Sequence, residues 1–359
     1  GTTGRQKSVC LTSINEVLSA HDVMIHFPFS FADVSMNTTP WFHRGGLHSG
    51  GITPTLYAGG TVVIQRKFQA AQTLDAVEKY GLTFIIGTTA VLIVSLLVCQ
   101  LFLPLKLSDT MPLNRVRLLA GMLMALCCGA IGFLDDYISV VKKRNMGLTD
   151  KQKLFLQLLI GTAYALWLYF NGGSVVAVPF IGQVDFGLWF IPFCIFIVAA
   201  ATNSANLTDG VDGLCGSVSF VASLFFVVAA GLLGFFEMGL TAAILAGALM
   251  GFLMWNLHPA KVFMGDTGSL FIGGMLCALA FGIGQPLLLI PVGIVYIVET
   301  LSVILQVTYF KLTHGKRLFK MSPLHHHFEM CRWSENRIVV TFSLVTLIGS
   351  AAGLLLMYV

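Results

Sequence analysis

Five aspartates lie in three short motifs, each at the point where an apolar segment of the chain ends. Asp266 shows the pattern most clearly, because the apolar stretches 242–255 and 270–281 flank it closely. A charge in such a place is costly unless it meets water, a cation or a polar partner. Taken alone, the motif around Asp266 is equally compatible with a solvated turn between helices and with a functional site. The five residues are Asp135, Asp136, Asp209, Asp212 and Asp266.

The chemistry that such aspartates favour is phosphoryl transfer. Clustered carboxylates repel one another unless a divalent cation lies among them. Oxygen-rich sites with few protein ligands suit Mg²⁺, which keeps several waters and is commonly shared with substrate phosphates. Lys153 and Lys261 are the lysines that would neutralise phosphate oxygens. Mg²⁺ between phosphates and an aspartate is the usual equipment for phosphoryl transfer, in which positioning and charge stabilisation provide most of the catalysis.

A run of three histidines, His325, His326 and His327, lies between Leu324 and Phe328. A histidine run can bind metal, but adjacent residues on a helix face different directions, so three in a row rarely bind one ion. We favour hydrogen bonding to a phosphate or a sugar.

The composition excludes an ordinary soluble protein. Hydrophobic residues make up 56% of the chain, charged residues only 11%, and the mean hydropathy is +0.83. A polytopic helical membrane protein fits these values. The eight cysteines include no C-x-x-C pair, so neither a disulfide framework nor a zinc site is indicated.

We expect nine apolar segments of roughly membrane-spanning length in an all-α bundle. Between the third and the fourth, residues 174–186 alternate apolar and polar and predict a small hairpin or an interfacial loop. The segments lie near 84–104, 115–134, 154–171, 187–204, 216–235, 239–256, 268–283, 285–309 and 337–358.

The alternation of spans brings the three aspartate motifs and the histidine run to one side of the membrane. The loops on that side, near 135–153, 205–215, 257–267 and 310–336, also hold most of this region's lysines and arginines. The other side receives only Lys106, Arg115 and Arg117. By the positive-inside rule, the side with the motifs is cytoplasmic.

Polar residues inside the apolar segments have several interpretations. Glu299 and Gln306 lie seven residues apart on one helical face, and we favour a structural role, in which they bond to neighbouring parts of the bundle. Asn203 and Asn256 lie at the cytoplasmic ends of their segments, where substrate binding and helix capping are comparable expectations.

Residues 1–87 read as soluble. Residues 62–64 (VVI) predict a strand, and residues 70–80 (AAQTLDAVEKY) have the spacing of an amphipathic helix.

Residues 88–359 resemble the polyprenyl-phosphate hexose-1-phosphate transferase superfamily, and within it the phospho-MurNAc-pentapeptide transferase branch. Four long motifs in the right order carry the resemblance, and the last favours this branch over the related GlcNAc-1-phosphate branch. The motifs are residues 132–137 (GFLDDY), 206–213 (NLTDGVDG), 259–269 (PAKVFMGDTGS) and 315–329 (GKRLFKMSPLHHHFE).

The resemblance implies an integral enzyme of the bacterial inner membrane with its active site on the cytoplasmic face. The implied reaction transfers phospho-MurNAc-pentapeptide from UDP-MurNAc-pentapeptide to undecaprenyl phosphate and yields lipid I and UMP, with Mg²⁺ as cofactor. The lipid bilayer is a further implied partner, no nucleic acid is expected, and a homodimer is compatible with this interpretation. A transporter remains the alternative from another class, because intramembrane acids also mark ion pathways.

The resemblance also implies roles for individual residues. Asp266 would hold Mg²⁺, whereas Asp135 and Asp136 would face the lipid phosphate, with Asp135 as general base. Either an aspartate attacks the nucleotide covalently or the lipid phosphate attacks directly, and we favour direct attack because that phosphate is already anionic. Phosphate or sugar contacts would come from Lys153, His325, His326 and His327. The substrate-binding residues would be Asn203, Asn206, Asp209, Asp212, Asn256 and Phe263. The last four of these would line the nucleotide pocket.

The N-terminal part departs from that family. The family has ten spans, and its first helix and the loop before its second helix have no recognisable counterpart. Residues 1–87 instead resemble a fragment of an acyl-CoA synthetase-type adenylating enzyme, through residues 1–9 (GTTGRQKSV), 41–46 (WFHRGG) and 57–68 (YAGGTVVIQRKF). The later motifs of an adenylating enzyme are absent from this chain, so we expect no activity from the fragment and a seam near Gly87 and Thr88.

Overall fold

The computed structural model describes residues 34–37, 61–64, 112–141 and 147–357. The chain divides into two compact units, Gly1–Thr73 and Leu74–Val359. In the first unit, strand β1 (Val34–Asn37) pairs in parallel with strand β2 (Thr61–Ile64), which confirms the strand expected at 62–64. The helix expected at 70–80, the first span near 84–104 and the seam near 87 lie outside the described residues.

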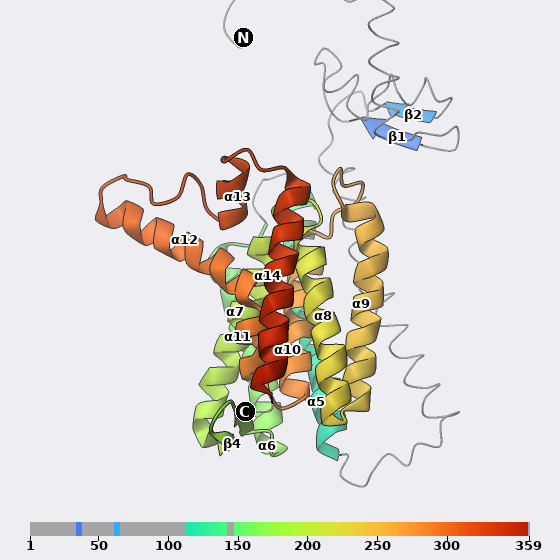
Figure 1. The fold of residues 1–359 in the computed structure, drawn as a ribbon, viewed down its shortest axis with the longest axis vertical. Coiled ribbons are helices and arrows are strands. Elements are labelled where there is room, and N and C mark those ends of the chain that lie inside the picture. The colour runs from blue at the N-terminus through green and yellow to red at the C-terminus, as the bar shows by residue number, and fades with distance from the viewer. Residues whose placement is uncertain (1–33, 38–60, 65–111, 142–146, 358–359) are drawn as a thin grey trace, which may run out of the picture. The chain divides into compact units, whose positions relative to one another are not determined.

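The second unit is a helical bundle (Figure 1). The described residues contain eight helices that are long and apolar enough to cross a membrane, and these confirm eight of the nine expected spans. They are α5 (Pro112–Val141), α6 (Asp150–Phe170), α7 (Phe190–Thr208), α8 (Leu214–Leu233), α9 (Phe236–Asn256), α10 (Gly265–Gly282), α12 (Ile294–Leu312) and α14 (Glu335–Leu356).

The connection between α6 and α7 is the expected hairpin. Strands β3 (Val175–Val178) and β4 (Gly182–Asp185) pair antiparallel, with Val176 opposite Val184. A 3₁₀ turn, Gly187–Trp189, then leads into α7.

The span expected at 285–309 exists as α12, but it begins later than predicted. The structure divides this stretch into a 3₁₀ turn (Pro286–Leu288), a short helix α11 (Leu289–Val292) and the long helix α12. Pro291 has no N–H to donate to the Leu287 carbonyl, so a regular helix cannot run unbroken through this stretch, and Gly293 separates the end of α11 from the start of α12.

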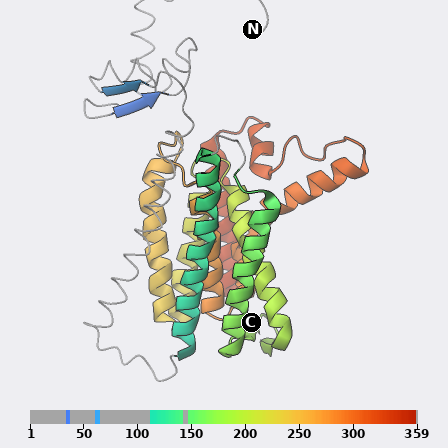
Figure 2. The same ribbon diagram turned by 180° about the vertical axis from the view of Figure 1, so that it is seen from behind.

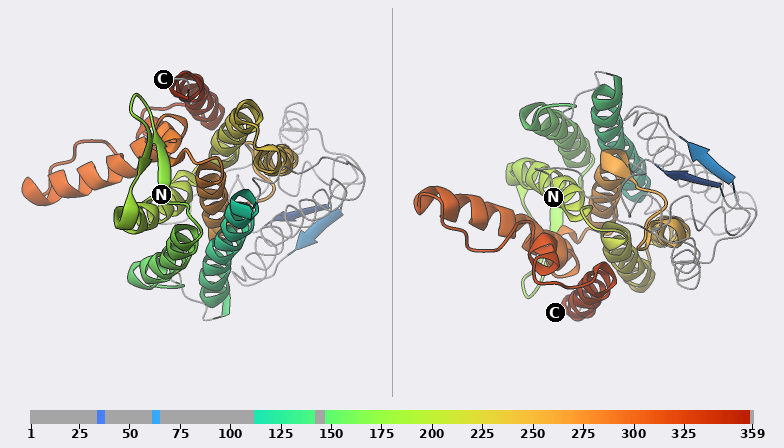
Figure 3. Two further views of the ribbon diagram at one scale, coloured as in Figure 1. Left: turned by 90° about the horizontal axis from the view of Figure 1, so that it is seen from below. Right: turned by 90° about the horizontal axis from the view of Figure 1, so that it is seen from above.

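Helix α10 runs through the middle of the bundle, with α5, α7 and α8 around it (Figure 3). Every residue from Thr267 to Gly282 is buried. Small residues allow the close approach: Gly121 of α5 lies against Ala278, and Gly274 lies against Ala125 of α5. Such pairs of small residues are typical of tightly packed membrane helices.

Helix α12 leaves the bundle at an angle, so its second half stands apart from the other helices (Figures 1 and 2). Leu305, Phe310 and Leu312 are exposed on this half. The chain then returns through a loop and the short helix α13 (Leu324–Glu329) to α14. The returning loop brings the histidine run back to the end of the bundle at which α5 and α7 finish.

Replacing Gly273 with alanine should destabilise the bundle. A methyl group there would lie 2.7 Å from the Ala201 carbonyl oxygen and 2.7 Å from the Thr202 Cα of α7, and these backbone atoms cannot move aside. Overpacking of this kind costs about 1–3 kcal/mol. Gly247→Ala on α9 is the control, because nothing lies within 4 Å of its added methyl group. Thermal unfolding of the detergent-solubilised protein should show a lower midpoint for Gly273→Ala alone, and equal midpoints would contradict the packing.

Candidate active site

Helix ends bring the predicted aspartates together. Asp135 and Asp136 lie in the last two turns of α5, and Asp209 follows the last residue of α7. Asp266 lies in the first turn of α10 and not in a turn between helices, which corrects the first of the two interpretations of its motif. Gly132 makes the approach possible, since a methyl group on it would overlap the Asp266 backbone.

Three carboxylates, those of Asp135, Asp136 and Asp266, form the centre of this site. One oxygen from each lies within 4.8 Å of the others. The Lys153 Nζ lies between two of them, 2.8 Å from Asp135 Oδ2 and 2.6 Å from Asp266 Oδ2. A single lysine therefore faces three acids, and the cluster keeps an excess of negative charge.

The remaining oxygens of the cluster are held by neighbouring donors. Thr267 donates from its hydroxyl to Asp136 Oδ2 at 2.8 Å and from its backbone N–H at 3.2 Å. The Asn206 amide donates to Asp266 Oδ1 at 2.8 Å and to the Ser269 hydroxyl. The Leu148 N–H donates to Asp135 Oδ1. These hydrogen bonds hold the three carboxylates in fixed orientations close to one another.

The residues present fit a hard divalent cation. The donor set consists of carboxylate oxygens, which Mg²⁺ prefers, and the unbalanced charge of the cluster favours a cation. Gly265, with φ of +61°, keeps the backbone close to the Asp136 carboxylate, where a methyl group would lie 2.9 Å from its Oδ2. The cluster of Asp135, Asp136 and Asp266 can therefore hold a metal ion, and the role of Asp266 as a ligand stays a prediction.

Asp209 lies in the turn between α7 and α8. Burial raises the pKa of this carboxyl well above the ordinary aspartate value, and the nearby charges of Asp266, Asp136 and Asp212 raise it further. Its electrostatic coupling to Asp266 and Asp136 links the second aspartate motif to the acidic cluster.

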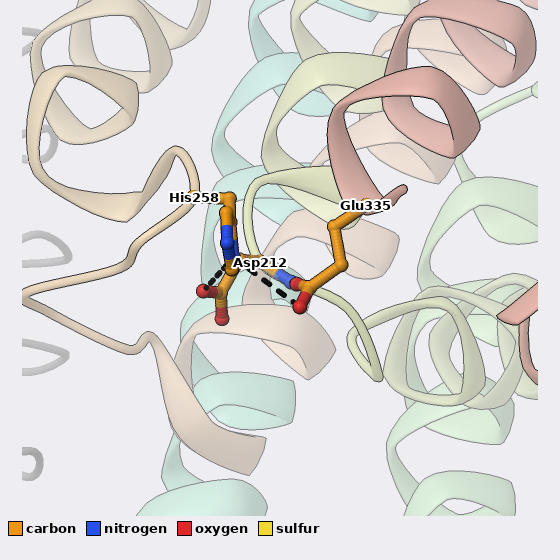
Figure 4. A group of neighbouring side chains, drawn as sticks. All are labelled: Asp212, His258 and Glu335. Carbon is orange, nitrogen blue, oxygen red and sulfur yellow. Dashed lines mark hydrogen bonds and ion pairs between the residues drawn. The ribbon is translucent and has the colours of Figure 1, made fainter. Parts of the chain in front are cut away.

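Asp212 belongs to a separate cluster (Figure 4). The His258 Nδ1 lies 3.1 Å from Asp212 Oδ2 and 3.2 Å from Glu335 Oε1. Asp212 also accepts from the Ala260 N–H at 2.9 Å. These contacts join the α7–α8 turn, the α9–α10 loop and the first residue of α14.

The predicted asparagines, Asn256 and Asn203, form hydrogen bonds that join separate segments of the chain. The Asn256 side chain is buried, accepts from the Gly213 N–H at 3.1 Å and donates to the Val262 carbonyl at 2.8 Å, so it behaves as a capping residue for two loops. Asn203 exchanges amide hydrogen bonds with Gln157, one turn beyond Lys153 on α6. Substrate binding by either stays a prediction.

Phe263 has a side chain that is exposed in the α9–α10 loop. Lys261 of the same loop lies over the Trp255 ring, 5.6 Å from its centroid. A nucleotide contact of Phe263 also stays a prediction.

The three histidines face different partners, as expected for adjacent residues on a helix. His325 is buried against Glu299 of α12, His326 contacts Glu329, and His327 accepts from the Lys320 N–H at 3.1 Å. Their expected contacts with a phosphate or a sugar stay predictions.

Glu299 and Gln306 confirm their expected structural role. Gln306 Oε1 accepts from the Leu318 and Phe319 N–H groups at 3.0 and 2.9 Å, whereas Glu299 binds His325. Both side chains therefore fasten the loop with the histidine run to α12.

Sequence reasoning missed several members of these clusters. Thr267 stands inside a predicted motif, and its place beside Asp266 was the available signal. His258 and Glu335 had no such signal, because 77 positions of sequence separate them and neither lies within a predicted motif.

Comparison with known proteins identifies the family of the chain. Residues 118–283, which include α6, α7 and the first turn of α10, match the family described as glycosyl transferase family 4. A phospho-N-acetylmuramoyl-pentapeptide-transferase of Clostridium botulinum (strain Eklund 17B / Type B) is 48% identical over 226 residues, which cover 63% of this chain and 69% of that relative. The chain belongs to the phospho-N-acetylmuramoyl-pentapeptide-transferase family.

Two further relatives carry the same name. The Halalkalibacterium halodurans protein is 46% identical over 259 residues, covering 72% of this chain and 78% of the relative. The Pelotomaculum thermopropionicum protein is 49% identical over 247 residues, covering 66% and 76%. Residues 1–131 separately match the family described as AMP-binding enzyme. The chain is thus a membrane-embedded transferase of a bacterial family, joined to a segment that is similar to another enzyme class.

The acidic cluster should bind a divalent cation through Asp266. Because a cation that binds only the folded state stabilises it, Mg²⁺ at about 100 times its dissociation constant should add about 2.7 kcal/mol to the free energy of unfolding. Asp266→Asn should abolish this stabilisation. Asp185→Asn in the β3–β4 hairpin, where the carboxylate accepts from the Gly187 N–H, is the control and should keep it. Thermal unfolding with and without Mg²⁺ measures both, and an equal response of the two variants would contradict the metal site.

Proposed function

We propose that this chain transfers phospho-MurNAc-pentapeptide from UDP-MurNAc-pentapeptide to undecaprenyl phosphate, releasing UMP and forming lipid I. The observation that carries the proposal is the meeting of Asp135, Asp136 and Asp266 around Lys153 in a member of this transferase family. Acids at the end of a membrane bundle suit a reaction between a nucleotide-linked donor and a lipid acceptor, because both the polar donor and the membrane-bound acceptor can reach them.

Each residue of the acidic cluster has a proposed task. Asp266 holds Mg²⁺, which when bound neutralises the phosphate oxygens of the nucleotide. Asp135 and Asp136 orient the acceptor phosphate, and Asp135 takes its proton where one is present. Lys153 already bridges Asp135 and Asp266, so it can pair with the phosphate charge that enters between them. Attack by the acceptor phosphate itself needs orientation more than activation.

The acceptor's lipid is proposed to lie along α12. A pocket of about 350 Å³ opens between the second half of α12 and the loop after it. Val307, Phe310 and Met321 give the pocket apolar walls, and Lys311 and Arg317 place two cations at it. The apolar walls suit part of the acceptor's hydrocarbon chain, and the two cations can extend their charged ends from these walls toward water.

The nucleotide is proposed to bind over the Asp209–Gly213 turn. Asp209 and Asp212 lie on that turn, Asn256 holds it to the α9–α10 loop, and Phe263 is exposed on the same loop. An exposed aromatic ring can stack on a nucleotide base. The two acids of the neighbouring turn can accept hydrogen bonds from the N–H groups of that base. His326 and His327 would then meet the sugar or the phosphates from the neighbouring α13 loop.

The site is proposed to face the cytoplasm, because the loops at its end of the bundle carry most of the basic residues of the second unit. The N-terminal segment, 1–87, is proposed to contribute no activity of its own.

UMP release tests the proposed function. The purified full chain, supplied with UDP-MurNAc-pentapeptide, undecaprenyl phosphate and Mg²⁺, should release UMP, and chelation of Mg²⁺ should stop the release. Asp266→Asn should lower the rate by about 10²-fold or more, since it removes the charge that holds the metal. Asp185→Asn should retain the full rate. A folded wild-type chain that releases no UMP, or equal losses in the two variants, would contradict the proposal.

A further inference from the structure

A fully buried carboxylate and imidazole join α12 to α13. The Glu299 side chain is 0% exposed and the His325 side chain 1% exposed. Glu299 Oε1 accepts from the His325 backbone N–H at 3.1 Å, and Glu299 Oε2 lies 3.1 Å from the His325 Nδ1. A buried charge is costly unless it is paired and hydrogen-bonded, and here both oxygens meet the same residue. The His325 backbone and ring are therefore held together by one carboxylate.

The contact with Glu299 determines how the imidazole presents its other nitrogen. A carboxylate only accepts hydrogen bonds, so the His325 Nδ1 carries the hydrogen in this pair. The opposite nitrogen, Nε2, is buried and has no hydrogen-bond partner in the part of the chain that the structure describes. Because buried polar atoms are nearly always paired, an unpaired nitrogen at such a place calls for a functional explanation.

Gly210 covers this nitrogen. A methyl group added to Gly210 would overlap Nε2 and contact the two neighbouring ring carbons. The ring cannot move aside, because Glu299 contacts both the backbone nitrogen and the ring Nδ1 of His325. Gly210 stands between Asp209 and Asp212, so the imidazole edge forms the floor beneath the turn that carries both acids.

We propose that Glu299 is a positioning residue for nucleotide binding: it fixes the His325 ring beneath Gly210 and thereby sets the conformation of the Asp209–Gly213 turn. This inference rests on the proposed function, which assigns that turn to the nucleotide. It differs from a simple attachment of α13 to α12, for which glutamine would serve as well.

Glu299→Gln separates these two roles. The amide oxygen of glutamine can still accept from the His325 N–H, so the attachment survives. Its NH₂ group can only donate to Nδ1, which moves the imidazole hydrogen to Nε2, directly beneath Gly210. The variant thus has nearly the same shape but presents the opposite hydrogen-bonding group to the turn.

Calorimetric binding of UMP to the detergent-solubilised full chain in Mg²⁺ tests the inference. Glu299→Gln and Gly210→Ala should each weaken UMP binding about tenfold or more, since residues that orient a site commonly matter to this extent. Ser302→Ala is the control: its buried hydroxyl lies on the same helix and bonds the Glu299 backbone carbonyl, not the carboxylate. It should bind UMP as the wild type does. Thermal unfolding midpoints identify any variant that fails to fold.

The double variant Glu299→Gln, Gly210→Ala provides an independent measurement. Because both changes act on one contact, their combined effect on UMP binding should be smaller than the product of the separate effects. Wild-type binding by a folded Glu299→Gln variant, or a fully multiplicative double variant, would overturn the inference. A wild-type chain that binds no UMP would instead contradict the proposed function, so the two failures are distinguishable.

Discussion

The placement of Lys153 between Asp135 and Asp266 is the interaction on which the rest of the site depends. Carboxylates this close repel one another, and the repulsion grows as water is excluded. Lys153, from α6, offsets part of it by contacting an acid of α5 and an acid of α10 at once. The arrangement holds three helices together at one end of the bundle and leaves negative charge for a further cation.

The packing of α10 makes this proximity possible. Its small residues let α5 and α7 approach its backbone closely, and Gly132 extends that approach to the level of Asp266. The same helix is buried along its length, so its first turn cannot shift without disturbing the core. A site built on such a helix is rigid, which suits a reaction that depends mainly on positioning and charge stabilisation.

The elements around the acidic cluster include a helix that leaves the bundle, the loop after it and the α7–α8 turn. Helix α12 leaves the bundle, and Gln306 and Glu299 attach the loop that follows it by binding its backbone and His325. The α7–α8 turn is likewise held from several sides, by Asn256, by the Asp212 cluster and by the imidazole beneath Gly210. Buried polar contacts thus support the turn between the acidic cluster and the α13 loop.

The amino-acid sequence by itself determined the class of protein, eight described spans, the β3–β4 hairpin and the four motif regions that meet at one end. Hydropathy and its alternation along the chain are local properties, so they can be read without coordinates. The tertiary structure decided which side chains pair: Thr267 with Asp136, Asn203 with Gln157, His258 with Asp212 and Glu335, and Glu299 with His325. It also decided that the stretch at 285–309 is broken before α12. Such pairs depend on how each helix is rotated about its axis and on how closely neighbouring helices approach, and periodicity along one segment carries no information about the rotation of another.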